Sequence, residues 1–155
     1  MKIILIKYGE LTTKKDNRKV FINILYNNIK KALVDYKVNI IKTRDRMYVE
    51  TEENIDEVVD ILKNIFGIHS IVVATRVNTN TEEIEANVLE VAKNIEFNTF
   101  KVETNRSDKS FPIPSMDFSR RIGSLILRNI PNKKVDVHNP DYLLHIEIRK
   151  DYTYI

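Results

Sequence analysis

The residue types that most often do chemistry are scarce in this sequence. The chain has no cysteine, which excludes disulfides, thiolate nucleophiles and cysteine-bound zinc or iron–sulfur clusters. Of its three histidines, His138 and His145 flank a turn, and no third ligand stands at metal-binding spacing. No serine stands with a histidine and an aspartate as a catalytic triad. We therefore expect neither a metal site nor a catalytic residue in this chain.

Phosphate-binding glycine loops are excluded in the same way. The three glycines, Gly9, Gly67 and Gly123, match neither the G-x-G-x-x-G nor the Walker spacing. The sequence therefore predicts no bound nucleotide cofactor in this chain.

Basic side chains form the more informative pattern. The net charge of +3 over 155 residues is small, but two mildly basic segments, 1–76 and 98–155, flank an acidic segment, 77–97. Cations at a helix start oppose the helix macrodipole, and this placement is easier to understand if phosphates bind there. An ordinary solvated surface would give the same charges, so charge alone leaves both interpretations open. The candidate contacts are Lys14, Arg18, Arg44, Arg46, Arg106, Lys109, Arg120, Arg121, Arg128, Lys133 and Lys134.

The first half of the chain has the order β-α-β-β-α-β. Apolar runs or alternation predict strands at 2–8, 38–42, 47–50 and 68–77, and apolar residues three or four apart predict helices at 21–36 and 55–65. We expect Asp16 or Asn17 to cap the first helix, Asn54 to cap the second, and Gly67 to be its C′ glycine. This order is typical of a ferredoxin-like fold, with two helices on an antiparallel sheet.

A polar break at 78–81 divides the chain into predicted domains 1–77 and 78–155. In the second domain we expect a helix capped by Thr81, a strand at 99–104, and a helix capped by Ser115 after a loop with two prolines. Strands follow at 134–137 and 142–149, and another begins at 152. The fold class is therefore α+β, and the sequence stops as if cut from a longer chain.

Several motifs then resemble a known family. The segment 100–112, Phe-Lys-Val-Glu-Thr-Asn-Arg-Ser-Asp-Lys-Ser-Phe-Pro, resembles the central motif of the THUMP domain, an RNA-binding module of tRNA-modifying enzymes. The segment 135–141 with 144–148 resembles its second signature. Tyr8-Gly9-Glu10-Leu11 and the segment 67–71 resemble tRNA 4-thiouridine synthetase (tRNA sulfurtransferase), in which a ferredoxin-like domain precedes the THUMP domain. Together these motifs cover essentially the whole chain.

The resemblance implies a tRNA-binding front half that grips the acceptor stem and 3′ end. In that family the whole enzyme forms 4-thiouridine and also serves the thiazole branch of thiamine synthesis. Its ATP-binding pyrophosphatase domain carries a Ser-Gly-Gly-x-Asp-Ser motif, which this sequence lacks. We therefore expect ATP, and a sulfur donor protein, to belong to a missing domain or a partner chain. The sequence also departs from the family at Lys15, where relatives usually have glycine.

Two other functions stay open at this point. The chain could be a stand-alone THUMP adaptor for another tRNA-modifying enzyme, or a ferredoxin-like module for small-molecule sensing or dimerisation. The apolar start, 1–7, is too short for a signal peptide or a membrane span, so we expect a cytoplasmic protein without a membrane partner. The sequence leaves open whether the molecule forms a homodimer.

Overall fold

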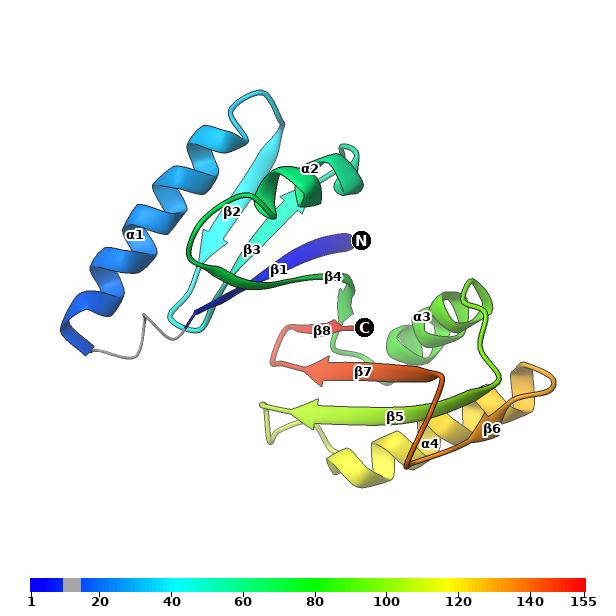
Figure 1. Ribbon diagram of the computed structural model, residues 1–155. Helices are drawn as coiled ribbons and strands as arrows, with labels where there is room; N and C mark the ends of the chain where they lie inside the picture. Colours follow the sequence, from blue (N-terminus) through cyan, green and yellow to red (C-terminus); the bar gives the residue numbers. More distant parts are fainter. Residues whose placement is uncertain (10–14) are drawn as a thin grey trace. The chain divides into compact units, whose positions relative to one another are not determined.

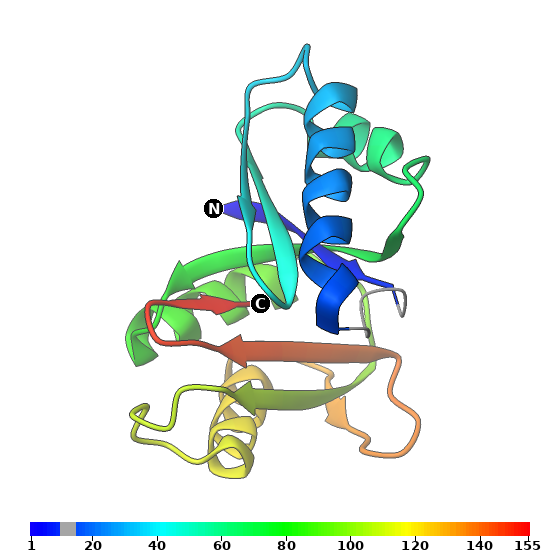
Figure 2. The ribbon, with the colours of Figure 1, turned by 90° about the vertical axis from the view of Figure 1, so that its left-hand side faces the viewer.

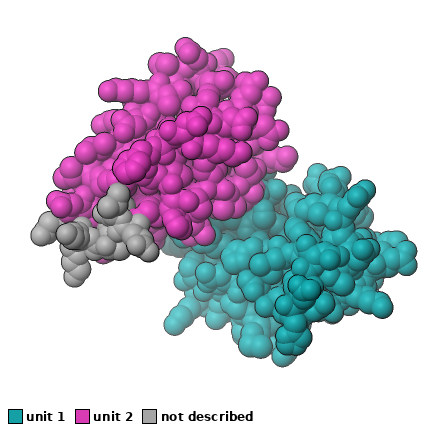
Figure 3. Space-filling model, in the orientation of Figure 1, with its two compact units in different colours: residues 1, 75–155 teal, residues 2–74 magenta. Residues whose placement is uncertain are grey.

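The chain folds into two compact units of mixed helix and strand (Figures 1 and 3). The computed structural model describes residues 1–9 and 15–155, including every side chain in these ranges except those of Lys15 and Asp16. Residues 2–74 form the N-terminal unit, and residues 1 and 75–155 form the C-terminal unit. In the described part of the chain, no helix is long and apolar enough to cross a membrane.

The N-terminal unit is a four-stranded sheet with both helices on one face (Figure 2). Its elements are β1 (Lys2–Tyr8), α1 (Lys15–Ala32), β2 (Val38–Lys42), β3 (Arg46–Thr51), α2 (Ile55–Leu62) and the first part of β4 (Ile68–Asn78). The strand order is β2-β3-β1-β4, and β3 pairs antiparallel with both β1 and β2. The core contains Ile4, Ile6, Leu25, Ile29, Leu33, Met47, Val49, Val58 and Leu62. The predicted ferredoxin-like fold is confirmed.

The helix ends of this unit test the predicted caps. Asn54 caps α2 as expected, because its side chain accepts hydrogen bonds from the backbone N–H groups of Asp56 (3.0 Å) and Glu57 (3.4 Å). The prediction for α1 is wrong: the helix begins at Lys15, so 16–17 lie inside its first turn.

Gly67 is not the C′ residue of α2, because that helix ends at Leu62. Its φ of 97° is a conformation that side chains with a Cβ rarely adopt. A Cβ at this position would also lie 2.8 Å from Cζ of Phe21. The glycine is therefore required by the turn into β4, rather than by the helix that it follows.

The C-terminal unit places two helices against a mixed sheet (Figure 1). Its elements are the end of β4, α3 (Thr81–Lys93), β5 (Thr99–Arg106), α4 (Ser115–Asn129), β6 (Lys134–Val135), β7 (Tyr142–Ile148) and β8 (Tyr152–Tyr154). The strand order is β4-β8-β7-β5-β6; β5 is parallel to β6 and β7, and β8 is antiparallel to β4 and β7. The core contains Ile84, Val88, Phe100, Phe118, Ile122, Ile126, Leu144, Ile146 and Ile148.

Both predicted caps in this unit are displaced by one residue. Asn80, and not Thr81, caps α3, since its side chain accepts from the N–H groups of Glu82 (2.9 Å) and Glu83 (3.1 Å). The residue before α4 is Pro114, which makes no side-chain cap, and Ser115 is the first helical residue. A proline suits this place because the first N–H groups of a helix need no partner inside it.

Candidate nucleic-acid interface

A groove runs between β5 and α4 in the C-terminal unit. It consists of two adjoining hollows, of about 460 and 450 Å³, that share Lys101, Val102, Ser119 and Arg120 in their walls. The size of each hollow is in the range of small-ligand pockets. The remaining walls come from Glu103, Thr104, Asn105, Ser115, Met116, Gly123, Ser124, Leu127, Val135, Val137 and His145.

The groove exists because the short strand β6 leaves most of β5 uncovered. β6 pairs with Thr99 and Phe100 only, whereas β7 pairs with β5 along 100–106 on its other side. Small residues on α4 keep the space open: a Cβ added to Gly123 would meet no heavy atom within 4 Å. The hydroxyl of Ser119 donates to Oγ1 of Thr104 at 2.8 Å and fixes the helix beside the strand. An uncovered strand edge presents backbone donors and acceptors to a ligand.

The charged groups on the groove differ in how strongly they are held. Arg120 has a side chain 75% exposed, and its contact to Asp117 is a loose 3.7 Å pair within the same helix. Lys101, which the sequence interpretation missed, pairs with Glu103 at 3.0 Å. Nδ1 of His145 lies 3.8 Å from the same carboxylate. Of the groove cations, Arg120 therefore has the weakest existing ion pair to break when a phosphate binds.

Arg106 braces the loop that carries the two prolines. Its Nη1 donates to the carbonyl of Phe111 at 2.7 Å and to that of Ile113 at 3.5 Å. Phe111 is buried and packs edge-to-face on Phe118, with ring centroids 5.4 Å apart. Phe111 is thus a core residue here, and it is not placed to stack on a base.

Asp108 shapes the tip of the same loop. It accepts hydrogen bonds from the hydroxyl of Ser110 at 2.6 Å and from its backbone N–H at 3.1 Å, and these bonds lower the pKa of Asp108. Ser110 therefore donates to a carboxylate that stays ionised, an arrangement that braces a turn. Lys109, between these two residues, is exposed.

Two other predicted contacts are engaged within the unit. Nε of Arg121 donates to Oε1 of Glu85 at 2.5 Å and links α4 to α3. Nζ of Lys133 donates to the carbonyl of Phe97 and lies 4.3 Å from the centre of its ring. In contrast, Lys109, Arg128 and Lys134 are exposed and make no ion pair with any described residue. Of the seven cations predicted in this unit, only Arg120 lines the groove.

In the N-terminal unit the fold brings two predicted contacts into one hollow. We name it the basic pocket; its volume is about 620 Å³, and its walls are Arg18, Lys19, Ile22 and Asn23 of α1 with Lys42, Thr43 and Arg44 of the β2–β3 hairpin. Arg18 and Arg44 were predicted from the sequence, and Lys42 was not, because a strand end gives no signal of what faces it. Lys14 lies outside the described residues.

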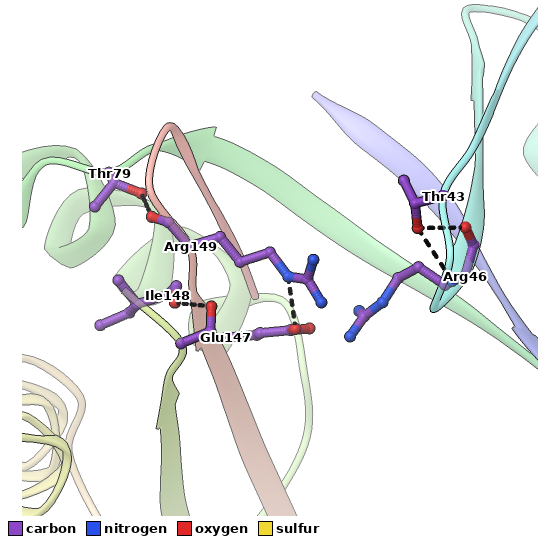
Figure 4. A network of polar contacts seen from close by, with 7 residues as sticks. Thr43, Arg46, Thr79, Glu147, Ile148 and Arg149 are labelled. Atoms are coloured by element: carbon purple, nitrogen blue, oxygen red, sulfur yellow. Dashed lines mark hydrogen bonds and ion pairs between the residues drawn. The ribbon is translucent and has the colours of Figure 1, made fainter. Parts of the chain in front are cut away.

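Arg46 is held differently from Arg44. The hydroxyl of Thr43 donates to the carbonyl of Arg46 at 2.8 Å, and the backbone N–H of Arg46 donates to the same hydroxyl at 3.2 Å (Figure 4). Arg46 is partly buried and does not line the basic pocket.

A polar network in the C-terminal unit closes the β7–β8 turn. The hydroxyl of Thr79 donates to the carbonyl of Arg149 at 2.7 Å, and Nε of Arg149 donates to Oε1 of Glu147 at 2.9 Å (Figure 4). These groups hold the strand ends together. Within the described residues, no group of three or more histidine and acidic side chains is placed to hold a metal ion.

Comparison with known families gives two matches. The family model of the ThiI ferredoxin-like domain matches residues 3–72, and that of the THUMP domain matches residues 78–155. A protein of Thermoanaerobacter pseudethanolicus named "Probable tRNA sulfurtransferase" is 53% identical over 149 residues, which are 96% of this chain and 39% of that protein. A protein of the same name from Staphylococcus aureus is 39% identical over 156 residues, 98% of this chain and 38% of its own length. The chain thus spans about two fifths of these relatives.

Solved structures give a likeness over the whole chain. A structure titled as a 4-thiouridine synthetase–RNA complex with bound ATP matches with a TM-score of 0.85 and 30% identity, over 100% of this chain and 40% of the other. The structure of PH1313 from Pyrococcus horikoshii matches with a TM-score of 0.83 and 32% identity, over 99% of this chain and 53% of the other. TrmN from Thermus thermophilus, at 15% identity and a TM-score of 0.62, shares the fold alone. The chain belongs to the THUMP family, and a ThiI ferredoxin-like domain precedes its THUMP domain.

Proposed function

We propose that this chain binds tRNA by its acceptor stem and unpaired 3′ end, as the RNA-binding part of a tRNA sulfurtransferase. The observation that carries this proposal is the likeness of the entire chain to a 4-thiouridine synthetase solved with RNA, at a TM-score of 0.85. The proposed contacts are the cations predicted from the sequence, except Arg121 and Lys133, which are engaged within their own unit, with Lys101 added. The proposal includes a cytoplasmic location.

The groove supports a single-stranded end as the ligand. The uncovered edge of β5 offers backbone groups, Arg120 and Lys101 offer positive charge, and Val102, Leu127 and Val135 offer apolar surface for sugars and bases. Side chains cannot enter the deep groove of an A-form stem, so proteins read tRNA stems by shape and backbone and read unpaired ends directly. We therefore expect the chain to clamp the unpaired 3′ end and to contact phosphates along the stem.

In this proposal the sulfur chemistry belongs elsewhere. ATP activation of the uridine would come from a pyrophosphatase-type domain, on the same or another polypeptide, and the sulfur from a donor protein. The chain itself contributes no thiolate, since it has no cysteine. Its part in 4-thiouridine formation is to position the tRNA; the whole enzyme would also serve thiazole synthesis.

The test is a titration of the chain with folded tRNA at about 50 and 200 mM salt, repeated with tRNA that lacks its unpaired 3′ end. We expect affinity to fall steeply with salt and to weaken further without the 3′ end. Equal affinity for both tRNAs would reject the clamp, and no binding at low salt would reject RNA binding by this chain.

Two neighbouring arginines provide a matched control for the groove. Arg120→Gln and Arg121→Gln remove the same charge from adjacent positions, but only Arg120 lines the groove, whereas Arg121 pairs with Glu85. We expect Arg120→Gln to lower tRNA affinity and to reduce the salt slope by about one ion. Arg121→Gln should leave affinity nearly unchanged and cost at most about 1 kcal/mol of stability. The reverse result would place the RNA on another face.

A further inference from the structure

The basic pocket of the N-terminal unit concentrates positive charge, and no carboxylate is among its described lining residues. Four of the seven described residues that line it, Arg18, Lys19, Lys42 and Arg44, are cations, and they come from α1 and from the hairpin. No ion pair joins any of them to a carboxylate among the residues that the structure describes. Asp45, next to Arg44, is exposed and is not part of the lining.

The partners that these cations do have are neutral. Nζ of Lys42 donates to Oδ1 of Asn23 at 2.7 Å and lies 4.6 Å from the centre of the Tyr26 ring. Both contacts orient the ammonium group without reducing its charge. Like charges held together in one hollow repel each other, and an anion bound between them would remove that repulsion.

Arg18 adds an independent observation. Its Nε is buried and has no hydrogen-bond partner in the described structure. An arginine binds a phosphate with two parallel N–H groups, of which Nε–H is commonly one. An unpartnered Nε beside a hollow is therefore one half of a phosphate-binding fork, and a small rotation of the side chain would present it to an oxyanion.

The hairpin wall of the pocket is fixed before any ligand arrives. The hydroxyl of Tyr8 donates to the carbonyl of Thr43 at 2.7 Å, and burial raises the pKa of Tyr8 to about 12. The hydroxyl therefore stays protonated and keeps donating throughout the neutral range. The hydroxyl of Thr43 in turn donates to the carbonyl of Arg46. Because this wall is already ordered, the protein loses less conformational entropy when a ligand binds.

We propose that the basic pocket binds a phosphate group, either of an RNA backbone or of a free nucleotide. Arg18 and Arg44 would hold the phosphate oxygens, and Lys19 and Lys42 would supply further charge. The volume of about 620 Å³ leaves room for the sugar attached to the phosphate. If the phosphate belongs to RNA, this inference rests on the proposed function and assigns the N-terminal unit an anchoring point on the tRNA.

The first experiment uses inorganic phosphate and the full chain. Amide resonances and the Nε–H resonance of Arg18 are followed by NMR while phosphate replaces chloride at constant ionic strength. We expect saturable shifts at Arg18, Asn23, Thr43 and Arg44, and a loss of phosphate affinity of about tenfold in the double variant Lys19→Gln/Arg44→Gln. Lys30→Gln, an exposed charge on the same helix, is the control and should bind as the parent does.

Two results would overturn the inference. One is shifts that do not saturate, and the other is saturable shifts that the double variant leaves unchanged. Both replaced side chains lie on exposed segments, and a circular dichroism melt establishes that the variant is folded.

The second experiment separates the two sources of phosphate. If tRNA displaces the phosphate and the double variant weakens tRNA binding, the ligand is the RNA backbone. If adenosine monophosphate binds about tenfold more tightly than phosphate while the double variant binds tRNA normally, the ligand is a free nucleotide. Saturable phosphate binding in a chain that binds no tRNA would sustain this inference and reject the proposed function. Binding of tRNA without saturable phosphate binding would sustain the proposed function and reject this inference.

Discussion

Arg106 is a predicted RNA contact whose side chain is held by the loop that follows it. Its Nη1 group donates to the carbonyls of Phe111 and Ile113, within the loop segment between Lys109 and α4. A lysine keeps the charge but lacks the rigid, planar guanidinium from which Nη1 reaches both carbonyls. The structure therefore assigns Arg106 a bracing contact, and its role as a direct phosphate contact stays a prediction.

We predict that Arg106→Lys lowers the free energy of unfolding by about 1–2 kcal/mol, because a charge-assisted hydrogen bond is lost. Its tRNA affinity should fall as a consequence of the loosened loop. Lys109→Gln is the comparison variant: the side chain is exposed, so affinity should fall while stability holds. Urea denaturation and tRNA titration measure the two quantities. If Arg106→Lys weakens tRNA binding at full stability, Arg106 contacts the RNA directly.

At the residue scale, the sequence could locate the cations but could not say which were already engaged. Arg121 pairs with Glu85 on another helix, and Lys133 reaches the carbonyl of Phe97. Both partners are distant in sequence, so no local pattern reports them. Lys101 was missed for the opposite reason, since an alternating strand hides which of its residues borders a groove.

The start of α3 shows the same limit at the scale of an element. Asn80 and Thr81 are adjacent, and both residue types are common N-caps, so propensity could not choose between them. The structure selects Asn80, whose side chain accepts from the backbone N–H groups of Glu82 and Glu83. Thr81 is the first residue of the helix, where its hydroxyl has no capping task.

This assignment predicts different costs for two neighbouring substitutions. Asn80→Ala should lower the free energy of unfolding by about 1 kcal/mol, because two N–H groups at the helix start lose their acceptor. Thr81→Ala should change it by less than about 0.5 kcal/mol. Urea denaturation of both variants decides the matter. A larger loss for Thr81→Ala would mean that the helix is capped one residue later, as the sequence suggested.

Most of the fold was predictable because the spacing of apolar residues identifies each helix and strand, and the order of these elements along the chain fits a known fold. The strand order β2-β3-β1-β4 is the one expected for the β-α-β-β-α-β pattern. The helices α3 and α4 bury apolar residues four apart, Ile84, Val88 and Ala92 on α3 and Phe118, Ile122 and Ile126 on α4. The groove was not predictable in this way. It arises because β6 has only two residues and because Gly123 leaves space on α4, and both facts depend on three-dimensional packing.

For the whole molecule, the small net charge of +3 has to be reconciled with binding to a polyanion. Affinity for RNA depends on how many phosphates the cations reach, since each contact releases counterions. Acidic residues on the outer face of α3 reduce the net charge without lining the groove or the basic pocket. The position of the charges should therefore matter more than their sum.

Two pairs of variants with equal net charge test this statement. Lys109→Gln/Arg120→Gln removes two charges from the proline loop and the groove, and Lys30→Gln/Lys93→Gln removes two exposed charges from the last turns of α1 and α3. We expect the first pair to lower tRNA affinity by about tenfold or more and to reduce the slope of log K against log salt by about 1–2. The second pair should leave the slope near its original value. Equal effects of both pairs would mean that tRNA affinity depends on the total charge of the molecule. That result would contradict the assignment of the groove as the interface.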